Sequence, residues 1–153
     1  MSADQLDFDV LLYVALSEEF DALSEALTEE LKVELKVTEV PDLPLQVFSI
    51  NVPSPVLKKE IRLGIVPAGK MGTTRAATVV SGFLDRCQCN NVVVLGIAGS
   101  LSDDLQPGDV LIPDSVTEYL ANSAAKNDGG EEDWNLETSG NNYPTNRRLL
   151  NRF

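Results

Sequence analysis

Apolar residues gather along the chain into short runs that predict strands alternating with helices. The continuous run Phe8–Ala15 predicts a buried first strand, because strands covered on both faces lack the polar alternation of half-exposed ones. Ser17 is a predicted helix N-cap, followed by two glutamates that favour the positive end of a helix dipole. The apolar residues after it recur every three or four positions, as on one face of a helix: Phe20, Leu23, Leu27 and Leu31.

The middle of the chain adds three predicted strands and a second helix. The strands occupy Val33–Val37, Leu45–Val52 and Ile61–Val66, and the prolines around the first two favour edge positions. A turn at Gly69–Gly72 precedes a predicted helix from Thr73 to about Cys87. Its inward-facing residues are predicted to be Ala76, Ala77, Val80, Phe83 and Leu84.

Two further apolar runs complete the predicted sheet. Val92–Leu95 predicts a central strand covered on both faces, and Val110–Ile112 predicts the last strand. The order β-α-β-β-β-α-β-β indicates an α/β fold with a mixed central sheet flanked by helices. Ligands of such sheets bind at the carboxyl ends of strands, so the turn Gly96–Gly99, whose glycines allow close approach to a ligand, is a candidate site.

The composition changes near residue 122, which divides the chain into three parts. Residues 1–121 form the predicted α/β core. Residues 122–142 are polar and rich in Gly, Asn, Asp and Glu, which predicts a long loop or a disordered segment. Residues 143–153 are typical of the start of a further helix, with Thr145 or Asn146 near its cap. A helix this short buries little, so we expect the chain to be a fragment or an unusually short protein.

Charge and residue usage exclude several function classes. The chain has 24 acidic and 12 basic residues and a net charge of −12, which disfavours binding to nucleic-acid phosphates. It has no histidine, which excludes Ser-His and Cys-His nucleophiles and histidine metal sites. Cys87 and Cys89 are expected near a helix end as free thiols, and two such ligands alone do not make a zinc site.

Neither a membrane span nor a secretion signal is indicated. No apolar run approaches the roughly 20 residues that cross a bilayer. The acidic N-terminus lacks the basic and then apolar layout of a signal peptide. We therefore expect a cytoplasmic protein that does not act on a membrane.

Three blocks of sequence resemble one family. Val92–Asp114 contains a strand, a G-I-A-G turn and a "GD-apolar-apolar" strand, which resembles the nucleoside phosphorylase and nucleosidase superfamily. Val14–Phe20 (VALSEEF) is similar to the start of the methylthioadenosine/adenosylhomocysteine nucleosidases, and Pro67–Ala77 resembles the family's strand-to-helix turn. The resemblance implies a nucleoside phosphorylase-like fold whose second half lies beyond Phe153.

The resemblance also implies roles for particular residues. Glu19 matches the glutamate that activates the attacking water, a sensible task for a carboxylate beside an oxocarbenium-like transition state. The alternative is that Glu19 is simply an acidic residue in the first turn of a helix. The implied substrate-lining residues are Ala15, Met71, Gly72, Ile97, Ala98 and Gly99. Ile97 departs from the Ser or Thr of many members, which removes a hydroxyl beside the ribose or phosphate.

The implied activity is hydrolysis of the N-glycosidic bond of an adenosine-type purine nucleoside or nucleotide. Glu18 and Glu19 would repel a phosphate dianion, which favours hydrolysis, although a phosphorylase stays an alternative. The family's acid for the leaving purine and its ribose-gripping residues are not identifiable here, so we expect the fragment alone to be inactive. No metal or organic cofactor is implied, and a homo-oligomer is expected.

Two interpretations in which the chain is not an enzyme stay open. The G-I-A-G form of the turn resembles divergent members fused to other modules, so the chain is alternatively a nucleoside-sensing or effector module of a larger signalling or defence protein. A structural α/β remnant without a ligand is the other alternative. A downstream Met-Glu pair and a Ser-Asp pair in the parent chain would favour catalysis over both.

Overall fold

The computed structural model describes residues 6–118, 124–127, 134–137 and 140–147. The chain divides into two compact units, Met1–Gly99 and Ser100–Phe153.

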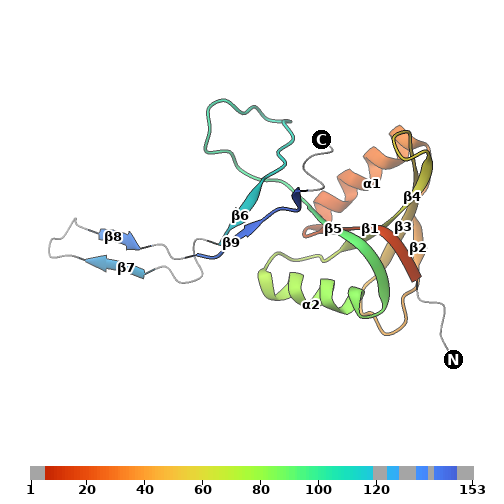
Figure 1. Ribbon diagram of the computed structural model, residues 1–153, viewed down its shortest axis with the longest axis horizontal. Coiled ribbons are helices and arrows are strands. Elements are labelled where there is room, and N and C mark those ends of the chain that lie inside the picture. Colours follow the sequence, from red (N-terminus) through yellow and green to blue (C-terminus); the bar gives the residue numbers. More distant parts are fainter. Residues whose placement is uncertain (1–5, 119–123, 128–133, 138–139, 148–153) are drawn as a thin grey trace. The chain divides into compact units, whose positions relative to one another are not determined.

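The first unit is built on a mixed five-stranded sheet. Its elements in chain order are β1 (Leu6–Val14), α1 (Ser17–Leu31), β2 (Lys36–Thr38), β3 (Val47–Ser54), β4 (Lys59–Pro67), α2 (Thr73–Leu84) and β5 (Cys87–Leu95). The strand order is β2-β3-β4-β1-β5 (Figure 1). β1 runs parallel to both β4 and β5, whereas β3 runs antiparallel to β2 and β4. The α/β class with a mixed sheet, predicted from the order of apolar runs, is confirmed.

The two helices cover opposite faces of this sheet (Figure 1). On one face the α2 residues Val79 and Phe83 are buried in a cluster with Phe8 and Leu11 of β1. On the other face α1 packs its predicted apolar stripe against strand residues, with the ring of Phe20 4.7 Å from that of Phe48. Its packed residues are Phe20, Leu23, Leu27 and Leu31.

Three details of the helices differ from the sequence prediction. Ser17 is the first residue of α1 and Leu16 is its N-cap, so the predicted Ser17 cap is wrong. In α2, Ala77 and Leu84 are exposed rather than inward-facing. α2 ends at Leu84 rather than at about Cys87, and a tight turn leads into β5. The two cysteines follow this helix end, as expected, and lie at the start of the strand β5.

The strand β5 lies at an edge of the sheet in the described residues, with β1 as its neighbour. The prediction of a central strand covered on both faces is therefore wrong here, because Val94 is 73% exposed and Val92 and Leu95 are also exposed. Cys87 is nevertheless buried and Cys89 is partly buried. Burial raises the pKa of both thiols, which favours their protonated form. Both cysteines are free, as expected from the sequence.

The described residues of the second unit contain two small antiparallel ladders. β6 (Ser115–Thr117) pairs with β9 (Asn142–Pro144), and β7 (Ala124–Asn127) pairs with β8 (Trp134–Glu137). The predicted strand Val110–Ile112 is not formed, and its three apolar side chains are exposed.

Part of the polar segment also differs from its prediction. Residues 122–142, expected to be a loop or disordered, hold β7 and β8 among their described residues. A helix was expected from residue 143, but residues 143 and 144 belong to the strand β9 (Asn142–Pro144). The first helical residue after this strand is Arg147. The rest of that predicted helix, residues 148–153, lies outside the described residues.

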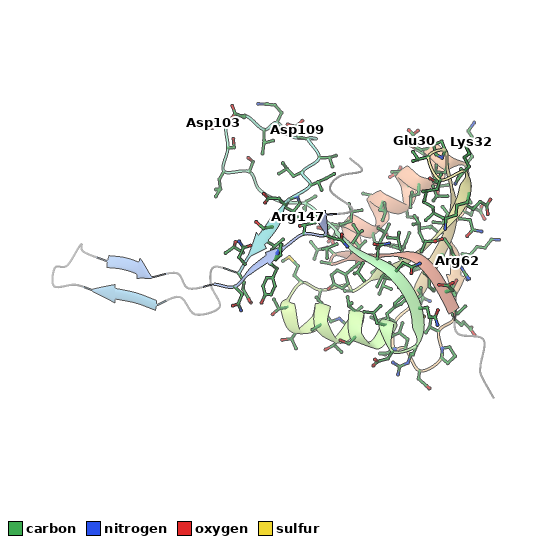
Figure 2. The ribbon with its side chains drawn as sticks, in the orientation of Figure 1. Glu30, Lys32, Arg62, Asp103, Asp109 and Arg147 are labelled. Atoms are coloured by element: carbon green, nitrogen blue, oxygen red, sulfur yellow. The ribbon has the colours of Figure 1, made fainter. Side chains whose placement is uncertain are left out.

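Charged side chains tie β1 to β4 near the amino end of β1. Asp9 accepts hydrogen bonds from Lys59 Nζ at 2.9 Å and from the backbone N–H of Arg62 at 2.9 Å. The hydrogen bond from Lys59 lowers the pKa of the Asp9 carboxyl. The Arg62 guanidinium also lies 4.8 Å from the centroid of the Phe8 ring, and Figure 2 shows Arg62 at this end of the sheet, away from the carboxyl ends of the parallel strands.

Gly64 in β4 is required by close packing, and we expect Gly64→Ala to lower the free energy of unfolding by about 2 kcal/mol. A Cβ at this position would lie 2.9 Å from Cδ1 of Phe8, whose ring is fully buried and cannot move aside. Gly82→Ala in α2 is the matched control. Its Cβ would meet the flexible end of Leu43 at 3.3 Å, so helix propensity should make this variant neutral or slightly more stable. Urea unfolding of both variants tests the contrast, and an unchanged midpoint for Gly64→Ala would contradict it.

Candidate functional site

Three loops meet at one edge of the first unit because their strands are parallel and in register. Val14 at the end of β1 is paired with Pro67 of β4 and with Leu95 of β5. Ala15, Ala68 and Gly96 therefore follow directly at the carboxyl ends of adjacent strands. This is the edge where ligands of open α/β sheets bind.

Glu19 connects two of these loops through its carboxylate. It lies in the first turn of α1, which begins just after β1. Its Oε1 accepts a hydrogen bond from the backbone N–H of Ile97 at 2.9 Å, and its Oε2 accepts one from the N–H of Leu16 at 3.0 Å. The first bond spans 78 residues of sequence and fixes the start of the turn after β5 against the start of α1.

The Glu19 carboxylate keeps room for a further donor. Two carboxylate oxygens offer about four lone-pair positions, and the two backbone N–H groups use one on each oxygen. The side chain is also only partly buried, so water reaches this edge. The arrangement can orient a carboxylate by the backbone while it accepts a proton from a bound water molecule.

The turn between β4 and α2 is held by its own set of hydrogen bonds. The N–H of Ala68 donates to the carbonyl oxygen of Val14 at 2.8 Å, which ties this turn to β1. The Arg75 guanidinium donates from Nε and Nη2 to the carbonyl oxygen of Ala68, at 3.2 and 3.0 Å. Gly69 and Gly72 have φ values of 71° and 126°, which favour glycine at both positions.

The predicted substrate-lining residues lie on these three loops. Ala15 follows β1 and is partly buried. Met71, on the turn before α2, is 73% exposed, and Ile97, after β5, is 84% exposed. Gly72, Ala98 and Gly99 are also exposed, and nothing lies within 4 Å of a Cβ built on Gly72 or Gly99. The edge thus offers apolar side chains and free backbone beside one anchored carboxylate.

The described residues contain no group of three or more His, Cys, Asp or Glu side chains able to hold a metal ion. Within the same residues, no helix is both long and apolar enough to cross a bilayer.

Comparison with known proteins shows to which family the chain belongs. A sequence model of the phosphorylase superfamily matches residues 9–153. The chain belongs to the phosphorylase superfamily. It is also similar to the 5'-methylthioadenosine/S-adenosylhomocysteine nucleosidase of Thermotoga maritima, with 38% identity over 73 residues. That match takes in 45% of this chain and 33% of the relative, so the chain spans about a third of the relative's length. No solved structure matches the chain.

Two features of this superfamily member were not found from its sequence. The role of Arg75 is one, because its ordinary position in a helix gives no sign of the hydrogen bonds to Ala68. The other is Gly96, which the sequence presents only as a glycine that lets a ligand approach. A Cβ at Gly96 would meet the Glu19 carboxylate instead, at 2.8 Å from Oε1.

We expect Arg75→Ala to lower the free energy of unfolding by about 1.5 kcal/mol, because two charge-assisted hydrogen bonds to Ala68 disappear. Lys70→Ala removes the same charge from an exposed position in the neighbouring turn and should change stability little. Chemical denaturation of the two variants measures the difference. Equal stabilities would show that the guanidinium does not hold the turn.

Proposed function

We propose that this chain carries the water-activating part of a purine nucleoside N-ribosyl hydrolase. The observation that carries the proposal is the Glu19 carboxylate, held by the N–H groups of Leu16 and Ile97 where the ends of β1 and β5 meet. The similarity to a 5'-methylthioadenosine/S-adenosylhomocysteine nucleosidase supports the same chemistry. The proposed substrate is an adenosine-type nucleoside or nucleotide.

In the proposed reaction, water attacks the anomeric carbon of the ribose while the bond from that carbon to the purine nitrogen breaks. The electron pair of that bond leaves with the purine. Glu19 takes a proton from the attacking water, and its negative charge stabilises the positive charge that develops on the sugar. The purine takes up a proton as it leaves, so each bond cleaved consumes one water and yields ribose and purine.

The remaining predicted residues have supporting roles in this proposal. Met71 and Ile97 offer exposed apolar surface against which a purine or a 5' substituent can pack. Gly72, Ala98 and Gly99 leave the backbone open to the substrate, and Ala15 lies directly after β1, partly buried. No cofactor is needed for this hydrolysis.

Hydrolysis is favoured over phosphorolysis by the charges at this edge. A phosphorylase must hold a phosphate dianion beside the sugar, usually with arginine. Arg75 already donates two of its N–H groups to the carbonyl oxygen of Ala68. Glu18 and Glu19 would repel phosphate at the end of β1. Among the described residues the hydrogen bonds to the Glu19 carboxylate come from backbone N–H groups and not from a cation, which fits activation of neutral water better.

The test is purine release by the protein as its gene encodes it. Adenosine, methylthioadenosine, adenosylhomocysteine, AMP and ATP are supplied separately, with and without phosphate. Release without phosphate supports the hydrolase and identifies the substrate. Release that requires phosphate contradicts it and indicates a phosphorylase, whereas tight binding without any release contradicts catalysis and favours a nucleoside sensor.

A further inference from the structure

Gly96 is the residue whose lack of a side chain makes room for the Glu19 carboxylate. A Cβ built on Gly96 would lie 2.8 Å from Oε1, 3.3 Å from Cδ and 3.4 Å from Oε2 of Glu19. A carbon atom 2.8 Å from a carboxylate oxygen is well inside van der Waals contact, so either the carboxylate or the backbone would have to move.

The backbone conformation does not by itself require glycine at this position. The glycines with positive φ in the described residues are Gly69, Gly72 and Gly108, and Gly96 is not among them. Gly99, in the same turn, has only open space around its Cβ position. The constraint on Gly96 therefore comes from the Glu19 side chain.

We infer that Gly96 is a positioning residue, which seats the Glu19 carboxylate on the N–H of Ile97. Two consecutive residues act on the same oxygen atom of Glu19. Gly96 leaves space beside Oε1, and the backbone N–H of Ile97 donates a hydrogen bond to it at 2.9 Å. The catalytic consequence of this role rests on the proposed function, whereas the placement of the carboxylate does not.

An alanine at Gly96 should disturb the carboxylate and spare the fold. The atoms that a Cβ would meet belong to the tip of one flexible, partly exposed side chain, which can turn away at low cost. Turning away breaks the bond between Oε1 and the Ile97 N–H. Gly96→Ala thus keeps the carboxylate but moves it, whereas Glu19→Ala removes the carboxylate altogether.

The first readout is hydrogen exchange at the Ile97 amide, measured by NMR on the 153-residue chain. We expect exchange about tenfold faster in Gly96→Ala, and similarly faster in Glu19→Ala, because the charge-assisted hydrogen bond protects this amide. Gly99→Ala adds the same methyl group to the same turn and should leave Ile97 exchange unchanged. The thermal unfolding midpoint of Gly96→Ala should stay close to that of the unmodified chain.

The second readout is kinetic and uses the protein as its gene encodes it. We expect Gly96→Ala to lower kcat for purine release by about 100-fold with little change in KM, because a displaced base loses its alignment with water and not its contribution to substrate binding. In the double variant Gly96→Ala/Glu19→Ala, the Gly96 substitution should have no further effect.

The outcomes separate this inference from the proposed function. Unchanged Ile97 exchange in Gly96→Ala, or loss of the fold, overturns the positioning role. Faster exchange in a protein that releases no purine supports the positioning role and contradicts the proposed function. Faster exchange with unchanged kcat in an active protein overturns the catalytic consequence of the position.

Discussion

Glu19→Gln should lower kcat for purine release by about 10²–10⁴-fold, the range expected when a general base is lost. The amide keeps the length and shape of the side chain and can still accept a hydrogen bond from Ile97 or Leu16. It cannot take a proton from water at neutral pH. Substrate binding should therefore change little, and steady-state kinetics with separate kcat and KM values measures the split.

Glu25→Gln is the matched control for this substitution. Glu25 lies on the same helix, exposed to solvent, so its substitution changes the net charge equally without touching the strand ends. We expect its kcat to stay within about twofold of the unmodified protein. A Glu19→Gln protein as active as Glu25→Gln would reduce Glu19 to an acidic residue that stabilises the start of α1.

Phe83→Ala should lower the free energy of unfolding by about 3–5 kcal/mol. The Phe83 side chain is completely buried, and its ring lies 5.4 Å from that of Phe8, which joins α2 to β1. Removing the ring loses its apolar burial and leaves a cavity that the two surrounding layers cannot close. A loss of this size is a large fraction of the roughly 5–15 kcal/mol that stabilises a typical domain.

Leu84→Ala is the control for Phe83→Ala. Leu84 is the next residue along α2 and is 43% exposed, so its truncation should cost less than about 1 kcal/mol. Guanidinium unfolding, followed by far-UV circular dichroism of the backbone, compares the stabilities of the two variants. Similar losses for the two would contradict the assignment of Phe83 to the core between α2 and the sheet.

The elements of the first unit could be predicted because their apolar spacing depends on local geometry. The period of the stripe from Phe20 to Leu31 places α1 against the sheet, and the apolar run of β1 fits a strand with helices on both faces. The place of a strand within the sheet could not be predicted in the same way. The apolar residues of β5 indicate a strand but not its neighbours, and they lie at an edge in the described residues.

The segment Val110–Ile112 shows the same limit more sharply. Its residues favour strands by their side-chain shape, yet no partner strand pairs with them in the described residues, and they stay irregular and exposed. Strand formation needs hydrogen bonds to a second segment, which a short apolar run does not specify.

The location of the candidate site could be predicted, but its internal contacts could not. Ligands bind at the carboxyl ends of strands, and on that rule the turn Gly96–Gly99 was a candidate site, whereas Ala15, Met71 and Gly72 were placed at the site by the family resemblance. The parallel pairing of β1 with β4 and β5 brings their following loops to one edge. The bond from Ile97 to Glu19 joins residues 78 positions apart, and no local pattern encodes it. The same holds for the space that Gly96 leaves beside that carboxylate.

The most direct measurement of the central claim is the fate of oxygen from labelled water. The protein as its gene encodes it is incubated in H₂¹⁸O that contains inorganic phosphate, with the substrate found in the release assay, and the sugar product is analysed by mass spectrometry. We expect free ribose, or the corresponding substituted ribose, with ¹⁸O at its anomeric carbon, and loss of this product in Glu19→Gln. A sugar 1-phosphate as the product would contradict it.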